Sequence, residues 1–185
     1  MSFIELPPLS PADYRLASET GTVRGDDTRG KGGTCLIEGT DEVGLNQRNN
    51  QQGTKTELAV ARYYGLEWSL EHRFDINTKS DVGDSMLQVR STRSRRPELA
   101  FYAGNNPGAY YLLVWVETDQ GPHRHHYFLC GGAWGYDLCN LGQRRTLPRS
   151  GGRETIAYYL PPRQLEPPWT REARDQKHDR QGIRW

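Results

Sequence analysis

The chain has 185 residues, of which 35% are hydrophobic, and its 24 basic and 23 acidic residues leave a formal net charge of +1. This length fits one domain with a real core, and three cysteines without paired spacing argue against a disulfide scaffold. The N-terminus lacks the features of a signal peptide and the longest apolar run, residues 110–116, is too short to span a bilayer, so we expect a cytoplasmic protein without a membrane partner.

The first 52 residues predict a short helix followed by a polar extension. Ser10 followed by Pro11 is typical of a helix start, and we expect this helix to end near Ala17. Residues 19–53 are rich in Gly, Asp, Thr, Asn and Gln and show little periodicity. They predict a long loop that holds at most a short strand at residues 35–38.

Residues 53–165 predict an α/β core, and residues 166–185 a charged, disordered tail. We expect a helix from Thr54 to about Gly65 and a short helix within residues 135–142. The run 110–117 is apolar on both faces, as in a central strand. The other expected strands cover residues 68–76, 86–92, 99–102, 126–130 and 155–160.

An acidic turn that leads into one of these strands carries the strongest functional signal. Gln88 and Arg90 are two positions apart on the strand, so they share a face, and Asp81 stands at its entry. Phosphodiester hydrolysis needs a cation, and Mg²⁺ (or Mn²⁺) prefers oxygen ligands. Asp81 and Gln88, with the Val89 carbonyl, are the candidate ligands. Arg90 would stabilise the transition-state charge, and Glu57 would orient a water from the preceding helix.

Each of these residues also has a structural explanation. Glu57 completes a Thr-x-x-Glu capping box that begins at Thr54. Asp81 and Asp84 flank Gly83 in a turn, where Asp commonly bonds the local backbone. Asp84 is also a spare metal ligand if the turn is read in another register. The order of helix, strand, acidic turn and strand favours a site more than any single residue does.

A run of arginines continues from the candidate site. Because Lys and Arg contacts to phosphates supply most non-specific nucleic-acid affinity, this run predicts DNA contact. A solvated edge strand is the alternative. The candidate DNA-binding residues are Arg93, Arg95 and Arg96. A second basic stretch either extends this surface or forms a solvated loop, and it comprises Arg144, Arg145, Arg149 and Arg153.

The order of Glu57, Asp81 and the Gln88-Val-Arg90 strand resembles the PD-(D/E)xK nuclease superfamily. More closely, residues 53–162 resemble a group of uncharacterised bacteriophage proteins with a DVG turn, a QVR strand and a following Thr/Ser-Arg run. The resemblance implies a restriction-endonuclease-like α/β (α+β) core with a mixed central sheet flanked by helices. It also implies a phage-encoded, Mg²⁺-dependent protein that hydrolyses DNA in the host cytoplasm.

Two residues depart from the superfamily pattern. Its second acid is Gln88 here, which removes a negative charge from the metal site, and its lysine is Arg90. Arginine does not deprotonate in proteins, so it can position or stabilise charge but cannot act as a base. Three functions follow as hypotheses: a DNA nuclease, a nuclease-fold protein that binds nucleic acid without cleaving it, and a phage interaction or assembly factor that uses residues 1–52 and 166–185.

Overall fold

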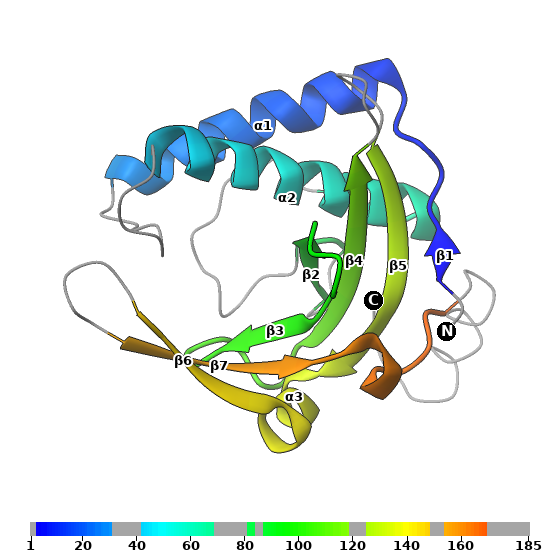
Figure 1. Ribbon diagram of the computed structural model, residues 1–185. Coiled ribbons are helices and arrows are strands. Elements are labelled where there is room, and N and C mark those ends of the chain that lie inside the picture. The colour runs from blue at the N-terminus through cyan, green and yellow to red at the C-terminus, as the bar shows by residue number, and fades with distance from the viewer. Residues whose placement is uncertain are drawn as a thin grey trace.

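The computed structural model describes residues 3–30, 42–68, 81–83, 87–118, 125–148 and 154–169, with the backbone alone described at 25–30 and 42–47. Across these ranges the chain is a mixed α+β fold of two sheets and three α-helices (Figure 1). None of the helices described there is long and apolar enough to cross a membrane.

The elements follow one another along the chain as two long helices and then mostly strands. The helices are α1 (Pro11–Gly30), α2 (Glu42–Tyr64) and α3 (Gly135–Leu141), with a 3-10 turn, η2 (Pro162–Gln164). The strands are β1 (Ile4–Glu5), β2 (Leu87–Thr92), β3 (Leu99–Tyr102), β4 (Tyr110–Thr118), β5 (His125–Trp134), β6 (Gln143–Pro148) and β7 (Glu154–Leu160).

The larger sheet has the order β1-β5-β4-β2, and β2 runs parallel to β4 while the other pairs are antiparallel. The register places Val89 beside Leu112 and Arg90 beside Leu113. Val89 and Leu112 pack in the same buried cluster as Val60 of α2. Because strand side chains alternate, Gln88 and Arg90 share the opposite face, as the sequence predicts.

The molecule is layered, with α1 on α2, α2 on the larger sheet, and the smaller sheet on the other side (Figure 1). The smaller sheet has the antiparallel order β3-β7-β6, and α3 lies beside it. A second apolar cluster fills the space between the sheets, where Tyr111 and Leu113 of β4 meet Phe101, Leu138 and Leu160. The central strand β4 is therefore buried on both faces.

The prediction that residues 19–53 form a loop is wrong for the part of this segment that the structure describes. The first helix continues to Gly30, and the second begins at Glu42 and passes Gly53 without a break. Neither helix is strongly amphipathic, so the hydrophobic pattern alone does not predict their length. Packing between the two helices stabilises them, since tertiary contacts commonly override weak local propensity. Residues 31–41, including the strand expected at 35–38, lie outside the described residues.

The remaining differences concern strand boundaries and the end of the chain. The strand expected at 68–76 lies outside the described residues, except for Trp68, which is not in a strand. Arg144 and Arg145 lie on a strand, β6. Glu166, which we assigned to the tail, pairs with Gly132 through two backbone hydrogen bonds of 2.9 and 3.1 Å. Chain order therefore extends at least to Trp169, whose ring stacks on that of Tyr110 at 5.0 Å.

Candidate functional site

The packing of α1 against α2 places the guanidinium of Arg24 beside the carboxylate of Glu57. Lys55 lies over the Tyr14 ring, and Thr54 Oγ1 donates a 2.7 Å hydrogen bond to the Ala17 carbonyl, so the helices run antiparallel. Helical side chains tilt toward the N-terminus of their own helix. In an antiparallel pair, Arg24 of α1 and Glu57 of α2 therefore lean toward each other, and Arg24 Nη1 lies 2.6 Å from Glu57 Oε2.

The capping-box explanation of Glu57 is wrong. Thr54 lies in the interior of α2, twelve positions beyond its first residue, and its hydroxyl bonds the Asn50 and Ala17 carbonyls. The Thr-x-x-Glu spacing is met by chance within a longer helix, because a capping box requires the Thr to precede the first turn. Glu57 consequently has no role at a helix end.

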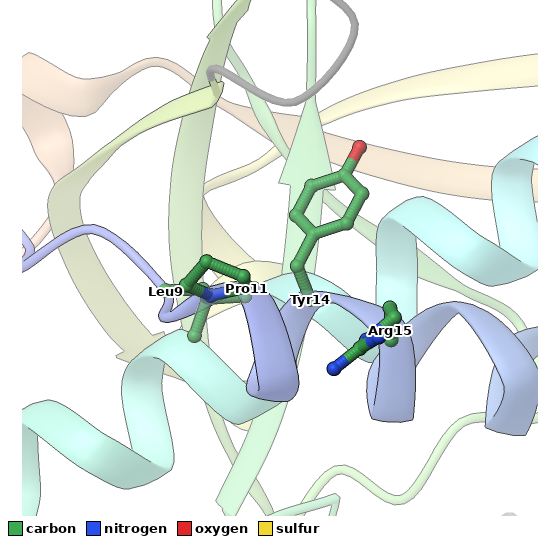
Figure 2. Close-up of a pocket in the computed structure, with 4 residues that line it drawn as sticks. All are labelled: Leu9, Pro11, Tyr14 and Arg15. Carbon is green, nitrogen blue, oxygen red and sulfur yellow. The ribbon is translucent and has the colours of Figure 1, made fainter.

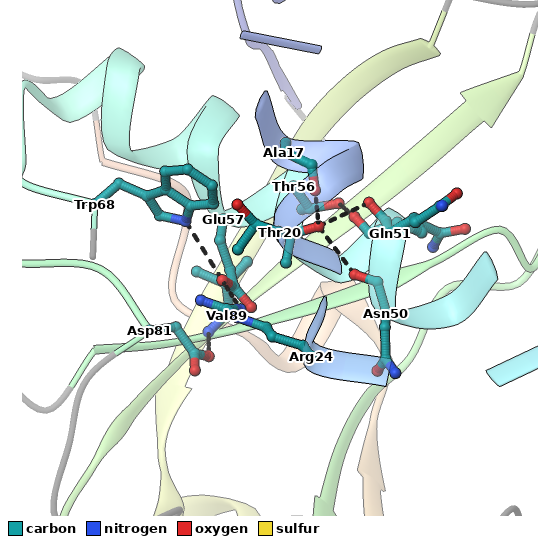
Figure 3. Close-up of polar contacts among 12 residues, drawn as sticks. Ala17, Thr20, Arg24, Asn50, Gln51, Thr56, Glu57, Trp68, Asp81 and Val89 are labelled. Atoms are coloured by element: carbon teal, nitrogen blue, oxygen red, sulfur yellow. Dashed lines mark hydrogen bonds and ion pairs between the residues drawn. The ribbon is translucent and has the colours of Figure 1, made fainter. Parts of the chain in front are cut away.

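Glu57 is a buried acid in an environment that penalises its charge. The residue is 8% exposed, and Trp68 Nε1 donates to Oε2 at 3.4 Å (Figure 3). Burial, and then the negative charge of Asp81, raise the pKa of Glu57 to about 7, against the opposing effects of Arg24 and Trp68. The carboxyl therefore exchanges its proton near neutral pH.

Asp81 is tied to the start of β2 by the backbone. Its N–H donates to the Leu87 carbonyl at 2.9 Å, and its Oδ2 accepts a 2.7 Å hydrogen bond from the Val89 N–H (Figure 3). Burial raises the pKa of Asp81, and the charges of Arg90 and Arg24 and the Val89 hydrogen bond oppose this. Bonding to the local backbone, as expected of an Asp in a turn, thus accounts for one oxygen of Asp81. It does not explain why the charges of both Arg90 and Arg24 act on this carboxyl.

The guanidinium of Arg90 lies among the oxygens that the sequence nominates as metal ligands. Its Nη1 is 3.6 Å from Asp81 Oδ2 and 3.3 Å from the Val89 carbonyl oxygen. Its Nη2 is 3.5 Å from Gln88 Oε1. The carbon of the guanidinium is 5.3 Å from the centre of the Tyr111 ring. Asp81, Gln88 and Arg90 are therefore brought together as predicted.

The two halves of the site are electrostatically linked. The Asp81 charge raises the pKa of Glu57, and the Arg24 charge lowers that of Asp81. Direct contacts therefore group Asp81, Gln88 and Arg90, while Glu57 contacts Arg24 and Trp68 and is linked to the first group through the charge of Asp81. Asp84, the spare ligand, lies outside the described residues.

Sequence reasoning missed Arg24 and Trp68 as members of the site. A signal for Arg24 was available, because Tyr14, Ala17, Gly21 and Arg24 are spaced three, four and three residues apart and so line one face of a helix. That spacing identifies a packing face but not the helix against which it packs. No local pattern around Trp68 points to Glu57.

The donor set has the chemistry that a hard cation requires. It offers a carboxylate, an amide oxygen and a backbone carbonyl, all of which suit Mg²⁺ or Mn²⁺. Within the described residues, no group of three or more His, Cys, Asp and Glu side chains is placed to hold a metal. The neutral oxygens of Gln88 and Val89 would therefore have to supplement Asp81.

The arginine run lies beside the site, whereas the second basic stretch is partly engaged elsewhere. The exposed residues that follow β2 are Arg93, Arg95 and Arg96. Arg145 forms two 2.7 Å hydrogen bonds with the Glu98 carboxylate and lies over the Tyr159 ring, so it stabilises the smaller sheet. Arg144 is exposed on β6, and Arg149 and Arg153 lie outside the described residues.

A pocket of about 330 Å³ opens at the start of α1, lined by Leu9, Pro11, Tyr14 and Arg15 (Figure 2). Its described lining does not include the acids or the amide of the candidate site.

Comparisons with protein-family models, with curated proteins and with solved structures give no match to this chain. Function is therefore inferred from the geometry of the site and from the sequence pattern.

Proposed function

We propose that the chain is a Mg²⁺-dependent (or Mn²⁺-dependent) nuclease-like protein that hydrolyses phosphodiester bonds in DNA. The proposal includes a restriction-endonuclease-like core and a phage origin, as the sequence resemblance implies. One observation carries it: Arg90 lies 3.6 Å from Asp81 and 3.5 Å from Gln88, and the charge of Asp81 acts on the buried acid Glu57 of α2. Carboxyls with raised pKa values, grouped with cations, are typical of catalytic sites, and here Glu57 is buried and Asp81 half-buried.

Each residue has a distinct role in the proposed reaction. Asp81 and Gln88, with the Val89 carbonyl, would hold the metal ion, which when bound would supply charge neutralisation and an acidified water. Glu57 accepts the proton of the attacking water, since its pKa of about 7 suits a general base at neutral pH. Arg90 stabilises charge on the phosphate, and Arg24 holds the Glu57 carboxylate in place.

A cleavage assay with matched acid variants tests this function. Single- and double-stranded DNA are incubated with the protein and Mg²⁺ or Mn²⁺. We expect Asp81→Asn and Glu57→Gln each to lower the rate by about 100-fold or more. Asp13→Asn is the control, because Asp13 is a carboxylate that pairs with Arg62 at 2.7 Å, away from the site. Cleavage that is unchanged in Asp81→Asn would rule out the assignment.

A second function, DNA binding without cleavage, is favoured by the position of Arg90. The guanidinium supplies a built-in positive charge to the oxygens that a metal would use. A protein of this kind binds DNA in EDTA, with an affinity that falls as the salt concentration rises, and needs no divalent metal. Binding that is independent of the metal, together with the absence of cleavage in the wild-type protein, would favour this function over the first.

A further inference from the structure

We propose that Arg90 and a divalent cation compete for one seat, formed by Asp81 Oδ2, Gln88 Oε1 and the Val89 carbonyl oxygen, and that a DNA phosphate opens this seat by drawing Arg90 away. The inference rests on the proposed function, because it concerns the same site. It adds a regulatory property to that site: metal and DNA bind cooperatively, and each is held weakly without the other.

The contacts of Arg90 are those of a cation that is shared rather than fixed. Its three distances are 3.3, 3.5 and 3.6 Å, longer than the 2.7–2.9 Å of a strong charge-assisted hydrogen bond. Two other arginines show what fixed pairing looks like in this chain. Arg24 lies 2.6 Å from Glu57, and Arg145 makes two 2.7 Å bonds to Glu98. If another cation displaces the Arg90 guanidinium from these oxygens, only weak hydrogen bonds are therefore lost.

The seat admits one cation at a time. A guanidinium and a divalent ion around the same carboxylate oxygen would repel each other within a few ångströms. The oxygens are a carboxylate, an amide and a carbonyl, which serve a hard cation at least as well as they serve a guanidinium. Occupation by a metal therefore requires Arg90 to move.

A DNA phosphate is an alternative binding partner for the Arg90 guanidinium. The side chains of Arg90 and Asp81 are 27% and 25% exposed, so an anion in solution can reach the guanidinium. Arg90 also begins the run that continues with exposed Arg93 and Arg95, along which a DNA backbone would bind. A phosphate that binds Arg90 removes the competitor from the seat. Because coupling between two sites is reciprocal, metal must strengthen DNA binding by the same factor.

The test measures Mn²⁺ binding to the full chain by electron paramagnetic resonance, a readout that does not require cleavage. Without DNA, we expect Arg90→Met to bind Mn²⁺ about tenfold more tightly than the wild type. Arg90→Lys keeps the positive charge and should stay near the wild-type affinity. The gain should vanish in Asp81→Asn/Arg90→Met. Arg62→Met is the control, because Arg62 pairs with Asp13 on the surface and its loss should leave Mn²⁺ affinity unchanged.

A short DNA duplex with hydrolysis-resistant phosphorothioate linkages completes the cycle. It should raise the Mn²⁺ affinity of the wild type by about the same factor, but not that of Arg90→Met. If Arg90→Met is poorly folded by circular dichroism, Arg90→Gln takes its place. Equal Mn²⁺ affinity in the wild type and a folded Arg90 variant would overturn the inference even if the wild type cleaves DNA. Conversely, the predicted shifts without cleavage would support the seat and reject the nuclease.

Discussion

Arg24 of α1 and Glu57 of α2 form an ion pair of 2.6 Å, with side chains that are only 22% and 11% exposed. The pair joins a helix outside residues 53–165, the expected core, to Glu57, one of the two acids of the candidate site. The first helix is therefore part of the site's electrostatics and not an appendage to a separate core. It also compensates a charge whose burial would otherwise be costly.

Loss of the Arg24 cation should destabilise the protein in a pH-dependent way. At pH 8, Glu57 is ionised, and Arg24→Met should cost about 2–4 kcal/mol because it leaves a buried carboxylate without its closest cation. At pH 5 the cost should be smaller, since Glu57 is then largely protonated. Urea unfolding at both pH values measures the difference.

The surface pair Arg62–Asp13 provides the control for this experiment. Its nitrogen and oxygen are also close, at 2.7 Å, but the Arg62 side chain is 62% exposed. Arg62→Met should therefore cost at most about 1 kcal/mol. An equal cost for the two arginine variants at pH 8 would show that the Arg24–Glu57 pair behaves as a surface contact.

The raised pKa of Glu57 predicts that stability falls as the pH rises. The folded protein holds this proton up to about pH 7, whereas the ordinary value is 4.5, so the folded state binds the proton more tightly. The resulting stability is fully present below pH 4.5 and is lost as the pH passes 7. The raised pKa of Asp81 has the same sign.

Glu57→Gln should flatten this dependence because its side chain does not titrate. At pH 8 we expect the variant to be more stable than the wild type, on the order of 2 kcal/mol. Thermal unfolding at intervals from pH 4.5 to 8 gives both curves. Parallel curves for the two proteins would mean that Glu57 titrates with an ordinary pKa.

The sequence predicted the strands of the core more accurately than the two long helices. Gln88 and Arg90 alternate along the strand with Leu87 and Val89, which is a local property of the sequence. This alternation correctly predicts that Gln88 and Arg90 share the face opposite Leu87 and Val89. The run 110–117 predicts the central strand β4 because its residues are apolar on both faces. These features depend on residues that are adjacent in sequence.

The helices were underestimated because their stability comes from each other. The polar sequence of α1 contains Gly21 and Gly25, and its length cannot be judged without the helix that it contacts. The assignment of Glu57 to a capping box failed for the same reason: a Thr-x-x-Glu spacing is identical at the start and in the interior of a helix. Arg24 and Glu57 are 33 residues apart in the sequence. Their contact could be predicted only if the packing of the two helices against each other were already known.

A close approach of the two helices at Gly21 leaves no room there for a larger residue. A Cβ there would lie 2.5 Å from the Gln51 Cα and 2.7 Å from Thr54 Oγ1. Gly21→Ala should therefore destabilise the protein by about 1–3 kcal/mol, despite the better helix propensity of Ala. Gly53→Ala is the matched control, because a Cβ there meets only Glu57 Oε1, at 4.0 Å.

Gly53→Ala should stabilise the protein by about 0.5–1 kcal/mol, the usual gain for Gly to Ala inside a helix. Urea midpoints of the two variants therefore move in opposite directions. If both variants were stabilised, the helices would not approach each other closely at Gly21. The comparison tests the packing that places Arg24 beside Glu57.

The exposed arginines after β2 should set the salt dependence of DNA binding. Replacing Arg93, Arg95 and Arg96 together by Ala removes up to three phosphate contacts. The slope of log affinity against log salt concentration should become shallower by about 2–3, since each contact contributes about 0.9. Fluorescence anisotropy with a labelled duplex, measured at several salt concentrations, gives this slope.

A control of equal charge separates local contact from net charge. It replaces three exposed arginines that lie on separate elements and outside both basic stretches: Arg15, Arg62 and Arg163. If the run after β2 contacts DNA, the control triple variant should retain most of the wild-type slope, because screening at physiological salt limits the reach of each distant charge to about 8 Å. Equal changes in the two triple variants would show that overall charge, and not the surface beside Arg90, governs binding.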